Sequence, residues 1–454
     1  MVALLLSTLS GALLSAAFEP VGQWWVAPIA LAGHIYALSI SSRKVLSTFA
    51  FALTLNLIVL HWSSTFVGSI PWLILAIGMS VFYLPLALIS RWGVAAYPLL
   101  YVALEELRNR FPFGGFGWVR IAYTQADAPY SKMAAIGGAS ALSALTVLIA
   151  LILFCAFKRK YSPITLLPFL LLLIPINLST VGTSNVLMIQ GNVPQLGLDF
   201  NSRAKAVFNN HLERTKMELE KDPNVDFILW PENSVDVDPF LNSDVKAGLD
   251  SITKPLIIGA IMNKADNLLN TSILWGGDLP PIYIKQHLTP FGEYIPLRSL
   301  ASVISPYTDR VTDFSPGQGQ FFFTIKDAVI APVICFELID DQLLHQAAKG
   351  SNLIAVQTNS ATFGMSAESA QQLSMTRIRA IEHGRNIASV STTGYSAIID
   401  KSGAVTEQTG MGEAATVRGE VDLIEGQTPR DKAGCWALIG VLLVLALIAR
   451  RAYR

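Results

Sequence analysis

Apolar residues dominate both ends of this chain, and the long region between them has a mixed pattern. A helix that crosses a bilayer needs about 20 mostly apolar residues. Runs of this kind fall at 2–18, 24–40, 45–61, 71–90, 92–107, 133–157, 163–178 and 434–449. The pattern predicts a membrane domain of about seven transmembrane helices over 1–180. An eighth transmembrane helix and a basic cytoplasmic tail are predicted over 434–454.

Basic residues at the ends of these segments predict the orientation of the chain. Short loops that carry Lys and Arg face the cytoplasm. Such residues follow the second, fourth, sixth and eighth segments, as Arg43, Lys44, Arg91, Lys158, Arg159, Lys160, Arg450, Arg451 and Arg454. The loops after the first and third segments contain none. We therefore expect a multi-pass membrane protein with both termini in the cytoplasm and with residues 181–430 outside it.

The loop 108–132 departs from this rule, because the same count places it outside. It contains four basic residues, Arg108, Arg110, Arg120 and Lys132. It also contains the aromatic and glycine-rich run 111–118, and aromatic side chains anchor protein segments at the membrane–water interface. We interpret this loop as a functional or re-entrant segment rather than a plain connector.

Residues 181–430 alternate between strand-like and helix-like runs. The strand-like runs are 185–190, 226–230, 255–260, 272–275, 281–285, 328–334, 352–357, 387–391 and 395–400. The helix-like runs are 202–220, 239–251, 338–349 and 366–384. Short apolar runs that are bounded by polar turns and interleaved with helices predict a layered α/β domain with buried strands.

The composition narrows the range of functions. The chain has 454 residues, of which 15% are charged, whereas soluble domains carry about a quarter. Its formal net charge is zero, so no global field attracts nucleic acid. Three cysteines do not make a disulfide framework, and the six histidines show no metal-ligand spacing. The sequence has no Gly-rich phosphate loop either, so we predict neither a metal nor a cofactor.

Three short strings place reactive side chains where predicted strands end. They are W-P-E, which ends at Glu232, Y-I-K, which ends at Lys285, and V-I-C-F-E, which contains Cys335. Functional residues of layered α/β domains gather at strand ends, so we expect these side chains to meet. A cysteine between a strand and a helix faces the positive end of the helix dipole, and a nearby lysine favours its thiolate further. A carboxylate can accept the thiol proton, so the strings predict a cysteine nucleophile for acyl transfer.

Longer strings around these residues resemble a known superfamily. They are M-I-Q-G-N-V-P-Q at 188–195, W-P-E-N at 230–233, K-Q-H-L-T-P-F-G-E-Y-I-P at 285–296, A-P-V-I-C-F-E at 331–337 and M-T-R-I-R-A-I-E-H-G-R-N at 375–386. They make region 181–430 similar to the nitrilase, or carbon–nitrogen hydrolase, superfamily, which implies an α-β-β-α sandwich. With F-G-W at 116–118 and Q-A-D-A-P at 125–129, the whole chain resembles the bacterial apolipoprotein N-acyltransferase family.

The resemblance implies a site and a reaction. It implies Cys335 as the nucleophile, Glu232 as the general base and Lys285 as the group that stabilises the oxyanion. It adds Glu293 and Glu337 as supporting carboxylates near this triad. The implied reaction is a ping-pong N-acylation, in which a membrane phospholipid acylates the cysteine. The thioester then passes its acyl chain to the N-terminal diacylglyceryl-cysteine of a lipoprotein.

The resemblance also implies a setting for this reaction. The expected location is the bacterial cytoplasmic (inner) membrane, with the catalytic domain 181–430 on the extracytoplasmic side. The partners that it implies are the phospholipid donor, the lipoprotein acceptor and the bilayer itself. A monomer is expected, and no cofactor is implied.

Two departures from the family pattern leave the fit of the donor head group and of the acceptor open. Phe336 stands where many members have tyrosine. In the run 359–364, Ser360 and Thr362 stand where many members have aspartate and tryptophan. Neither departure changes a triad residue.

Two other functions remain open at this point. A membrane-tethered amidase or nitrilase-type hydrolase shares the triad and differs only in its acceptor, which is water. Soluble hydrolases of this superfamily need no membrane scaffold, so the eight apolar segments favour the acyltransferase. A transporter or sensor with a degenerate nitrilase-like module predicts the loss of at least one triad residue, and none is lost here.

Overall fold

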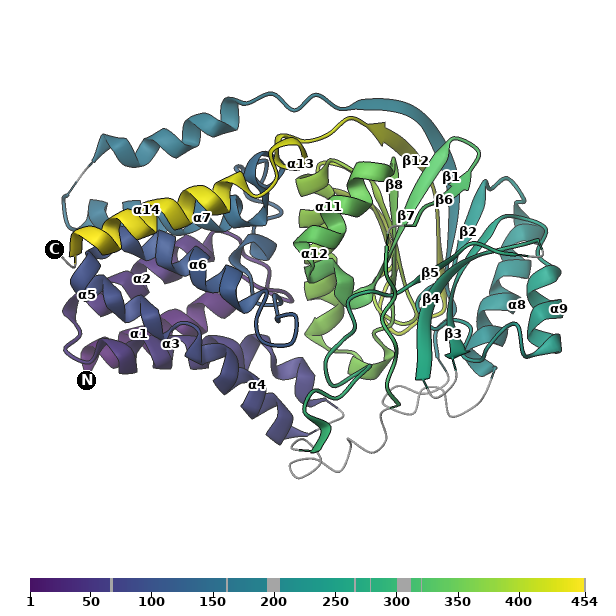
Figure 1. Ribbon diagram of the computed structural model, residues 1–454, viewed down its shortest axis with the longest axis horizontal. Helices are drawn as coiled ribbons and strands as arrows, with labels where there is room; N and C mark the ends of the chain where they lie inside the picture. The colour runs from purple at the N-terminus through teal and green to yellow at the C-terminus, as the bar shows by residue number, and fades with distance from the viewer. Residues whose placement is uncertain are drawn as a thin grey trace. The chain divides into compact units, whose positions relative to one another are not determined.

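The computed structural model describes residues 1–65, 68–160, 162–193, 205–264, 267–277, 279–299, 312–319 and 321–452. The chain divides into two compact units (Figure 1). Met1–Asn177 and Thr428–Arg454 form the first, which we name the helical unit, and Leu178–Gln427 forms the second, which we name the α/β unit.

The helical unit has helical structure in each apolar segment that the sequence pattern identifies. Its α-helices are α1 (Val2–Ser15), α2 (Val26–Ile40), α3 (Lys44–Val59), α4 (Ser69–Val81), α5 (Ile89–Trp92), α6 (Tyr97–Arg108), α7 (Met133–Phe157), α13 (Pro429–Ala433) and α14 (Trp436–Ala452). Its 3₁₀ helices are η1 (His61–Ser64), η2 (Leu84–Leu88), η3 (Val94–Ala96), η4 (Ile121–Thr124) and η5 (Pro163–Leu173). In the described part of the chain, Ser69–Trp92 and Met133–Phe157 are long and apolar enough to cross a membrane. The helical region therefore has two candidate spans, and its other apolar helices are shorter.

Proline interrupts the regular α-helix in two of the predicted spans. Over 71–90, α4 ends at Val81 and a 3₁₀ helix follows, with Pro85 in its first turn. Over 163–178, the chain forms a 3₁₀ helix that contains Pro168. Proline lacks a backbone N–H and clashes with the preceding turn, so neither segment continues as a regular α-helix.

The loop 108–132 is connected to the helical unit by two ion pairs, of which the one with Arg120 is buried. Glu106 of α6 pairs with both Arg110 and Arg120. The guanidinium of Arg120 also donates a hydrogen bond to the hydroxyl of Ser140 in α7, at 2.9 Å. Glu106 thus pairs with two of the four basic residues of this loop.

The α/β unit is built on two six-stranded mixed sheets. The strands are β1 (Ser179–Gln190), β2 (Phe227–Leu229), β3 (Leu256–Lys264), β4 (Asn267–Trp275), β5 (Ile282–Ile284), β6 (Phe323–Ile325), β7 (Ala328–Ile334), β8 (Leu353–Thr358), β9 (Ile387–Ser391), β10 (Ala397–Ile399), β11 (Val405–Gln408) and β12 (Ala415–Glu425). The helices are α8 (Ala206–Lys221), α9 (Ser243–Asp250), α11 (Asp341–Gly350) and α12 (Ala367–His383), with 3₁₀ helices η7 (Cys335–Ile339) and η8 (Ala361–Phe363). One sheet has the order β12-β1-β2-β3-β4-β5 and the other the order β11-β10-β9-β8-β7-β6.

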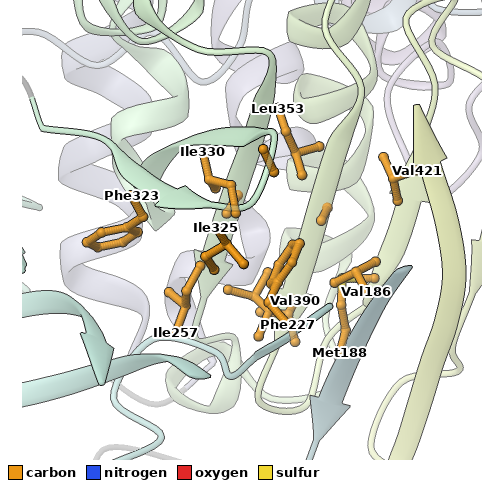
Figure 2. Packing of buried hydrophobic residues seen from close by; sticks show 14 of the residues in the cluster. Val186, Met188, Phe227, Ile257, Phe323, Ile325, Ile330, Leu353, Val390 and Val421 are labelled. Carbon is orange, nitrogen blue, oxygen red and sulfur yellow. The ribbon is translucent and has the colours of Figure 1, made fainter. Parts of the chain in front are cut away.

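Three apolar layers hold this unit together. The central layer joins the inner faces of the two sheets, with Val186 and Phe227 from one sheet and Ile330 and Val390 from the other (Figure 2). Helices α8 and α9 cover the outer face of the first sheet, and α11 and α12 cover that of the second. The layers run helix, sheet, sheet, helix, which confirms the predicted nitrilase-like sandwich.

The sequence pattern missed three strands, β6, β11 and β12, and all three lie at sheet edges. In β12, Val417 and Val421 are buried, while Glu420 is exposed. Charged residues on the exposed face of an edge strand lower its apolar content, and they also protect the edge from pairing with other chains. An edge strand is therefore less visible in the sequence than a central one.

Gly259 of β3 lets the backbone after β2 approach closely. The carbonyl of Gly259 accepts hydrogen bonds from the N–H of Val235, at 2.9 Å, and from the hydroxyl of Ser234, at 3.1 Å. A Cβ atom at position 259 would lie 2.3 Å from the carbonyl oxygen of Pro231 and 2.6 Å from the Cα of Glu232. No side chain fits there without moving the turn that carries Glu232.

We predict that Gly259→Ala destabilises the protein by about 1–3 kcal/mol, because overpacking forces the backbone to shift. For a unit of this size, that cost lowers the melting temperature by several degrees, at roughly 2–4 °C for each kcal/mol. Gly182→Ala in β1 is the matched control, since its Cβ would meet only the side chain of Leu423, at 3.7 Å. Thermal unfolding of the detergent-solubilised full chain measures both, and equal melting temperatures for the two variants would contradict this account.

Candidate active site

Lys285 lies between two carboxylates in the interior of the α/β unit. Its ammonium nitrogen is 3.1 Å from Oε1 of Glu232 and 2.8 Å from Oε2 of Glu293. The amide of Asn270 donates to both carboxylates, at 2.7 Å to Glu232 and 2.6 Å to Glu293. Lys285 is only 1% exposed, so water contributes little to holding these charges together.

Three neighbouring pieces of the first sheet position this cluster. Glu232 follows β2 in the turn that Gly259 allows. Lys285 follows β5 directly, and its N–H donates to the carbonyl of Asn270 in β4 at 2.9 Å. Glu293 lies in the turn after β5, where one of its oxygens accepts from the backbone N–H of Thr289 at 2.7 Å. The structure thus brings together three residues that are separated by up to 61 positions in the sequence (232 to 293).

The two carboxylates differ in their preference for a proton. Burial raises the pKa of Glu232, and the charge of Glu293 adds to this effect although Lys285 opposes it. Burial also disfavours the charged form of Glu293, but Lys285 and the hydrogen bonds hold its pKa below the usual value. Burial alone would lower the pKa of Lys285, yet the two carboxylates keep it above its usual value. Lys285 is therefore charged, and Glu232 is the better proton acceptor of the two carboxylates.

Cys335 lies at a strained junction between β7 and η7. Its φ is +50°, a region that residues other than glycine rarely adopt. Strand β7 ends at Ile334, and η7 begins at Cys335 itself. The amide of Gln372 in α12 donates to its sulfur at 3.5 Å. A strained strand-to-helix turn of this kind presents a nucleophile to a substrate, and its strain is consistent with a functional position.

The surroundings of Cys335 favour its protonated thiol, which differs from the thiolate that the sequence pattern predicts. Burial raises its pKa well above the usual value, and the charge of Glu232 raises it further. The charge of Lys285 acts in the opposite direction and does not overcome these two effects. These interactions bring Cys335 into the same electrostatic site as Glu232 and Lys285.

Glu337 connects the two strand ends that carry Lys285 and Cys335. One of its oxygens accepts from the N–H of Gln286, at 2.7 Å, and from the hydroxyl of Tyr283, at 2.8 Å. The other accepts from the N–H of Ile334 at 2.7 Å. The residue is fully buried, and burial raises its pKa to about 7. Glu337 thus braces the backbone on both sides of the site.

Sequence reasoning missed three polar residues of this site, Asn270, Gln372 and Glu368. Asn270 lies in β4, which begins five residues before the run that the pattern identifies as a strand, at 267 rather than 272. Gln372 and Glu368 lie on α12, whose extent the pattern predicts well. All three are buried polar residues. The available signal for Glu368 and Gln372 was the presence of polar residues within the amphipathic pattern of α12. That signal does not reveal which strand end α12 faces.

The two departures from the family pattern also find places in the structure. Phe336 is buried, and its ring packs edge-on against the ring of His287, with 5.5 Å between the centroids. Ser360 is buried beside the carboxyl group of Glu368. Within the described residues there is no group of three or more His, Cys, Asp or Glu side chains that could hold a metal ion.

The α/β unit is similar to a known protein family. A family model described as "Carbon-nitrogen hydrolase" matches residues 203–430. A solved structure of this superfamily, Nit3 from Saccharomyces cerevisiae, is 17% identical, with a TM-score of 0.41 over 54% of this chain and 91% of that chain. The sandwich and the matched residues define the α/β unit as a carbon–nitrogen hydrolase domain.

The comparison extends over the whole chain. A second family model, "Apolipoprotein N-acyltransferase N-terminal domain", matches residues 10–152. An apolipoprotein N-acyltransferase from Mycolicibacterium smegmatis is 32% identical over 95% of this chain and 82% of its own length. Another, from Haemophilus influenzae, is 27% identical over 98% of this chain and 94% of its own length. The chain belongs to the apolipoprotein N-acyltransferase family and is an acyltransferase, which confirms the resemblance found in its sequence.

We predict that Glu337→Gln destabilises the protein by about 1–3 kcal/mol, because an amide nitrogen cannot accept and one buried donor loses its partner. The loss of this hydrogen bond should also change the rate at which iodoacetamide alkylates Cys335. Thermal unfolding and timed alkylation measure the two effects, with Cys155 and Cys435 replaced by alanine so that one thiol reports. Glu407→Gln, at an exposed position of β11, is the control. Unchanged melting and alkylation in Glu337→Gln would contradict the bracing role.

Proposed function

We propose that this chain N-acylates the N-terminal diacylglyceryl-cysteine of lipoproteins, with a membrane phospholipid as the acyl donor and a thioester on Cys335 as the intermediate. The observation that carries the proposal is the buried Lys285 between Glu232 and Glu293, beside the strained Cys335. This arrangement provides a nucleophile, a proton acceptor and a fixed positive charge in a chain of this family. Each of the three is a requirement of acyl transfer through a covalent intermediate.

The first half-reaction acylates the enzyme. The sulfur of Cys335 forms a bond with the ester carbonyl carbon of the phospholipid, while Glu232 takes the thiol proton. The charge of Lys285 stabilises the oxyanion that develops on the carbonyl oxygen. The carbon–oxygen bond of the ester then breaks, and Glu232 returns the proton to the leaving oxygen. A lysophospholipid departs, and a thioester remains.

The second half-reaction transfers the acyl chain to the acceptor. The α-amino nitrogen of the lipoprotein's N-terminal cysteine attacks the thioester carbonyl carbon, and the carbon–sulfur bond breaks. Glu232 moves a proton from the nitrogen to the departing sulfur, which restores the thiol. Because both substrates use the same nucleophile in turn, the kinetics are ping-pong.

The proposal includes a membrane setting. Residues 1–180 and 434–454 would provide eight transmembrane helices in the bacterial cytoplasmic membrane, with both termini inside. The catalytic domain, 181–430, would then act as part of a monomer on the extracytoplasmic side, where it meets lipid-modified substrates. Support comes from the helices in all eight segments, from two stretches with the length and composition of spans, and from the basic residues at the segment ends.

We predict that incubation with phospholipid alone increases the mass of the intact protein by one acyl chain, carried on Cys335. Cys335→Ala should show no increase, because no nucleophile remains. Glu232→Gln and Lys285→Met should acylate about 10²–10⁴-fold more slowly, since they remove the proton acceptor and the oxyanion charge. Intact-protein mass spectrometry against time measures all four proteins.

A second addition separates transfer from hydrolysis. A diacylated lipopeptide should restore the original protein mass and gain the acyl chain itself, whereas water alone should leave the thioester in place over the same time. A thioester lost equally fast in water would favour a membrane-tethered hydrolase. Lipopeptide acylation by Cys335→Ala would refute the proposed intermediate.

We predict that a cysteine at position 246 reacts with a membrane-impermeant maleimide from outside the cytoplasmic membrane. Lys246 is exposed on α9, so the label can reach it. Arg159, exposed in a predicted cytoplasmic loop, gives the matched control, and Arg159→Cys should react only after lysis. Both variants require a background in which Cys155, Cys335 and Cys435 are alanine. The opposite labelling pattern would overturn the orientation.

A further inference from the structure

Glu368 is a buried carboxyl group to which the two half-reactions above give no part. It lies in the first turn of α12 and is 1% exposed. Its Oε2 atom has no hydrogen-bond partner within the described part of the chain. Leaving a buried polar atom without a partner costs free energy, so a native structure that keeps one calls for an explanation.

Glu368 lies next to the proposed nucleophile. It is one helical turn from Gln372 on α12, and residues at this spacing have Cβ atoms about 5–6 Å apart on the same face. The amide of Gln372 donates to the sulfur of Cys335. Burial is the main cause of the raised pKa of Cys335, and the charges of Glu232 and then Glu368 add to it. The carboxyl group therefore acts electrostatically on the atom at which the thioester forms.

The second half-reaction needs a proton acceptor that the first does not need. An α-amino group has a pKa of about 7.7–8.0, so it arrives at neutral pH mainly as an ammonium ion with three N–H protons. The amide product keeps one of them, so two must leave. Glu232 conveys one to the departing sulfur. The other must leave before the nitrogen can attack, because an ammonium ion has no lone pair.

We propose that Glu368 binds the α-ammonium group of the acceptor and takes its first proton, so that the free amine attacks the thioester. This inference rests on the proposed function. The proton moves from the nitrogen to Oε2 of Glu368 and later passes to water, while the nitrogen–carbon bond forms and the carbon–sulfur bond breaks. Glu368 is thereby a catalytic residue of the second half-reaction alone.

The chemistry of Glu368 matches this task. Burial raises its pKa to about 8, the hydroxyl of Ser360 opposes this effect, and the charge of Glu232 adds to it. Proton transfer is efficient when donor and acceptor have similar pKa values, and an α-ammonium group has nearly this value. An ammonium ion that binds here favours the charged carboxylate form of Glu368. Its binding therefore first displaces the proton that Glu368 holds when no substrate is bound.

Few other charges face Glu368. The hydroxyl of Ser360 lies beside its carboxyl group, and the titratable groups that interact with it are Glu232, from the turn after β2, and Cys335, from η7. On α11, which also packs against α12, Asp341 is paired with Arg379 at 2.7 Å. Strands β9 and β10 pack against α12 as well, and their sequences contain no ionisable side chain. The surroundings of Glu368 are thus negative, which suits a cationic ligand.

The experiment measures the rate of each half-reaction separately in the full chain that carries Glu368→Gln. Acyl-enzyme formation from phospholipid at pH 7 should change by about threefold or less, because Glu368 then holds its proton, is uncharged as glutamine is, and meets no ammonium group. Consumption of the thioester by a diacylated lipopeptide should lose about 10- to 100-fold in kcat/KM at pH 7, the loss expected for one hydrogen bond to a charged group. At about pH 9.5 the amine is uncharged, so the deficit should narrow to about threefold.

Two controls keep the result specific. Hydroxylamine, an uncharged nucleophile at neutral pH, should cleave the thioester of both proteins at similar rates. Glu420→Gln, on the exposed face of β12, should behave as the parent protein. The inference fails if lipopeptide and hydroxylamine consume the thioester of Glu368→Gln with the same deficit, or if the lipopeptide deficit is absent at pH 7 or persists at high pH. If the parent protein forms no thioester with phospholipid, the proposed function itself fails.

Discussion

The buried ammonium of Lys285 is the interaction on which the rest of the site depends. Charges removed from water cost several kcal/mol each, and removing one partner of a buried pair costs about 3–5 kcal/mol. Lys285 meets this constraint with a carboxylate on each side and with Asn270 bridging the two. Such an arrangement tolerates little displacement. The ends of β2 and β5, the middle of β4 and the turn at 289–293 must all keep their register for the cluster to exist.

The cluster has one positive and two negative charges, so its net charge is negative. This net charge affects the pKa of the proposed nucleophile, Cys335. An excess of negative charge raises the pKa of Cys335 in addition to burial. A free thiolate would be unstable there, so the sulfur cannot act by itself. In the proposed mechanism its proton therefore leaves as the sulfur attacks, and Glu232 is the group whose burial favours accepting that proton. The second carboxylate, Glu293, serves the lysine instead, because Lys285 and the N–H of Thr289 stabilise its charge.

The sequence predicted those parts of the site that follow from local pattern. Buried strands have short apolar runs as their signature, so the amino-acid pattern alone located Glu232, Lys285 and Cys335 at strand ends. The sandwich and the family followed from longer strings. Partners that depend on tertiary approach were not visible, since nothing near Asn270 or Gln372 in the sequence indicates which strand end each one reaches. The thiol pKa was predicted in the wrong direction for the same reason, because burial is a tertiary property.

The excess of negative charge also distinguishes the substrates that the site can use. Water and an alcohol arrive uncharged and gain nothing from it, whereas a primary ammonium ion is attracted to it and needs a base to take its proton, which is the part proposed for Glu368. Glu368, one helical turn from Gln372 where α12 covers the second sheet, joins the negative region once an ammonium ion displaces its proton in the proposed reaction. In that proposal, the negative charge favours an amine over water as the acceptor of the acyl chain. The same electrostatic imbalance that disfavours the thiolate of Cys335 thus suits the cationic acceptor of the proposed function.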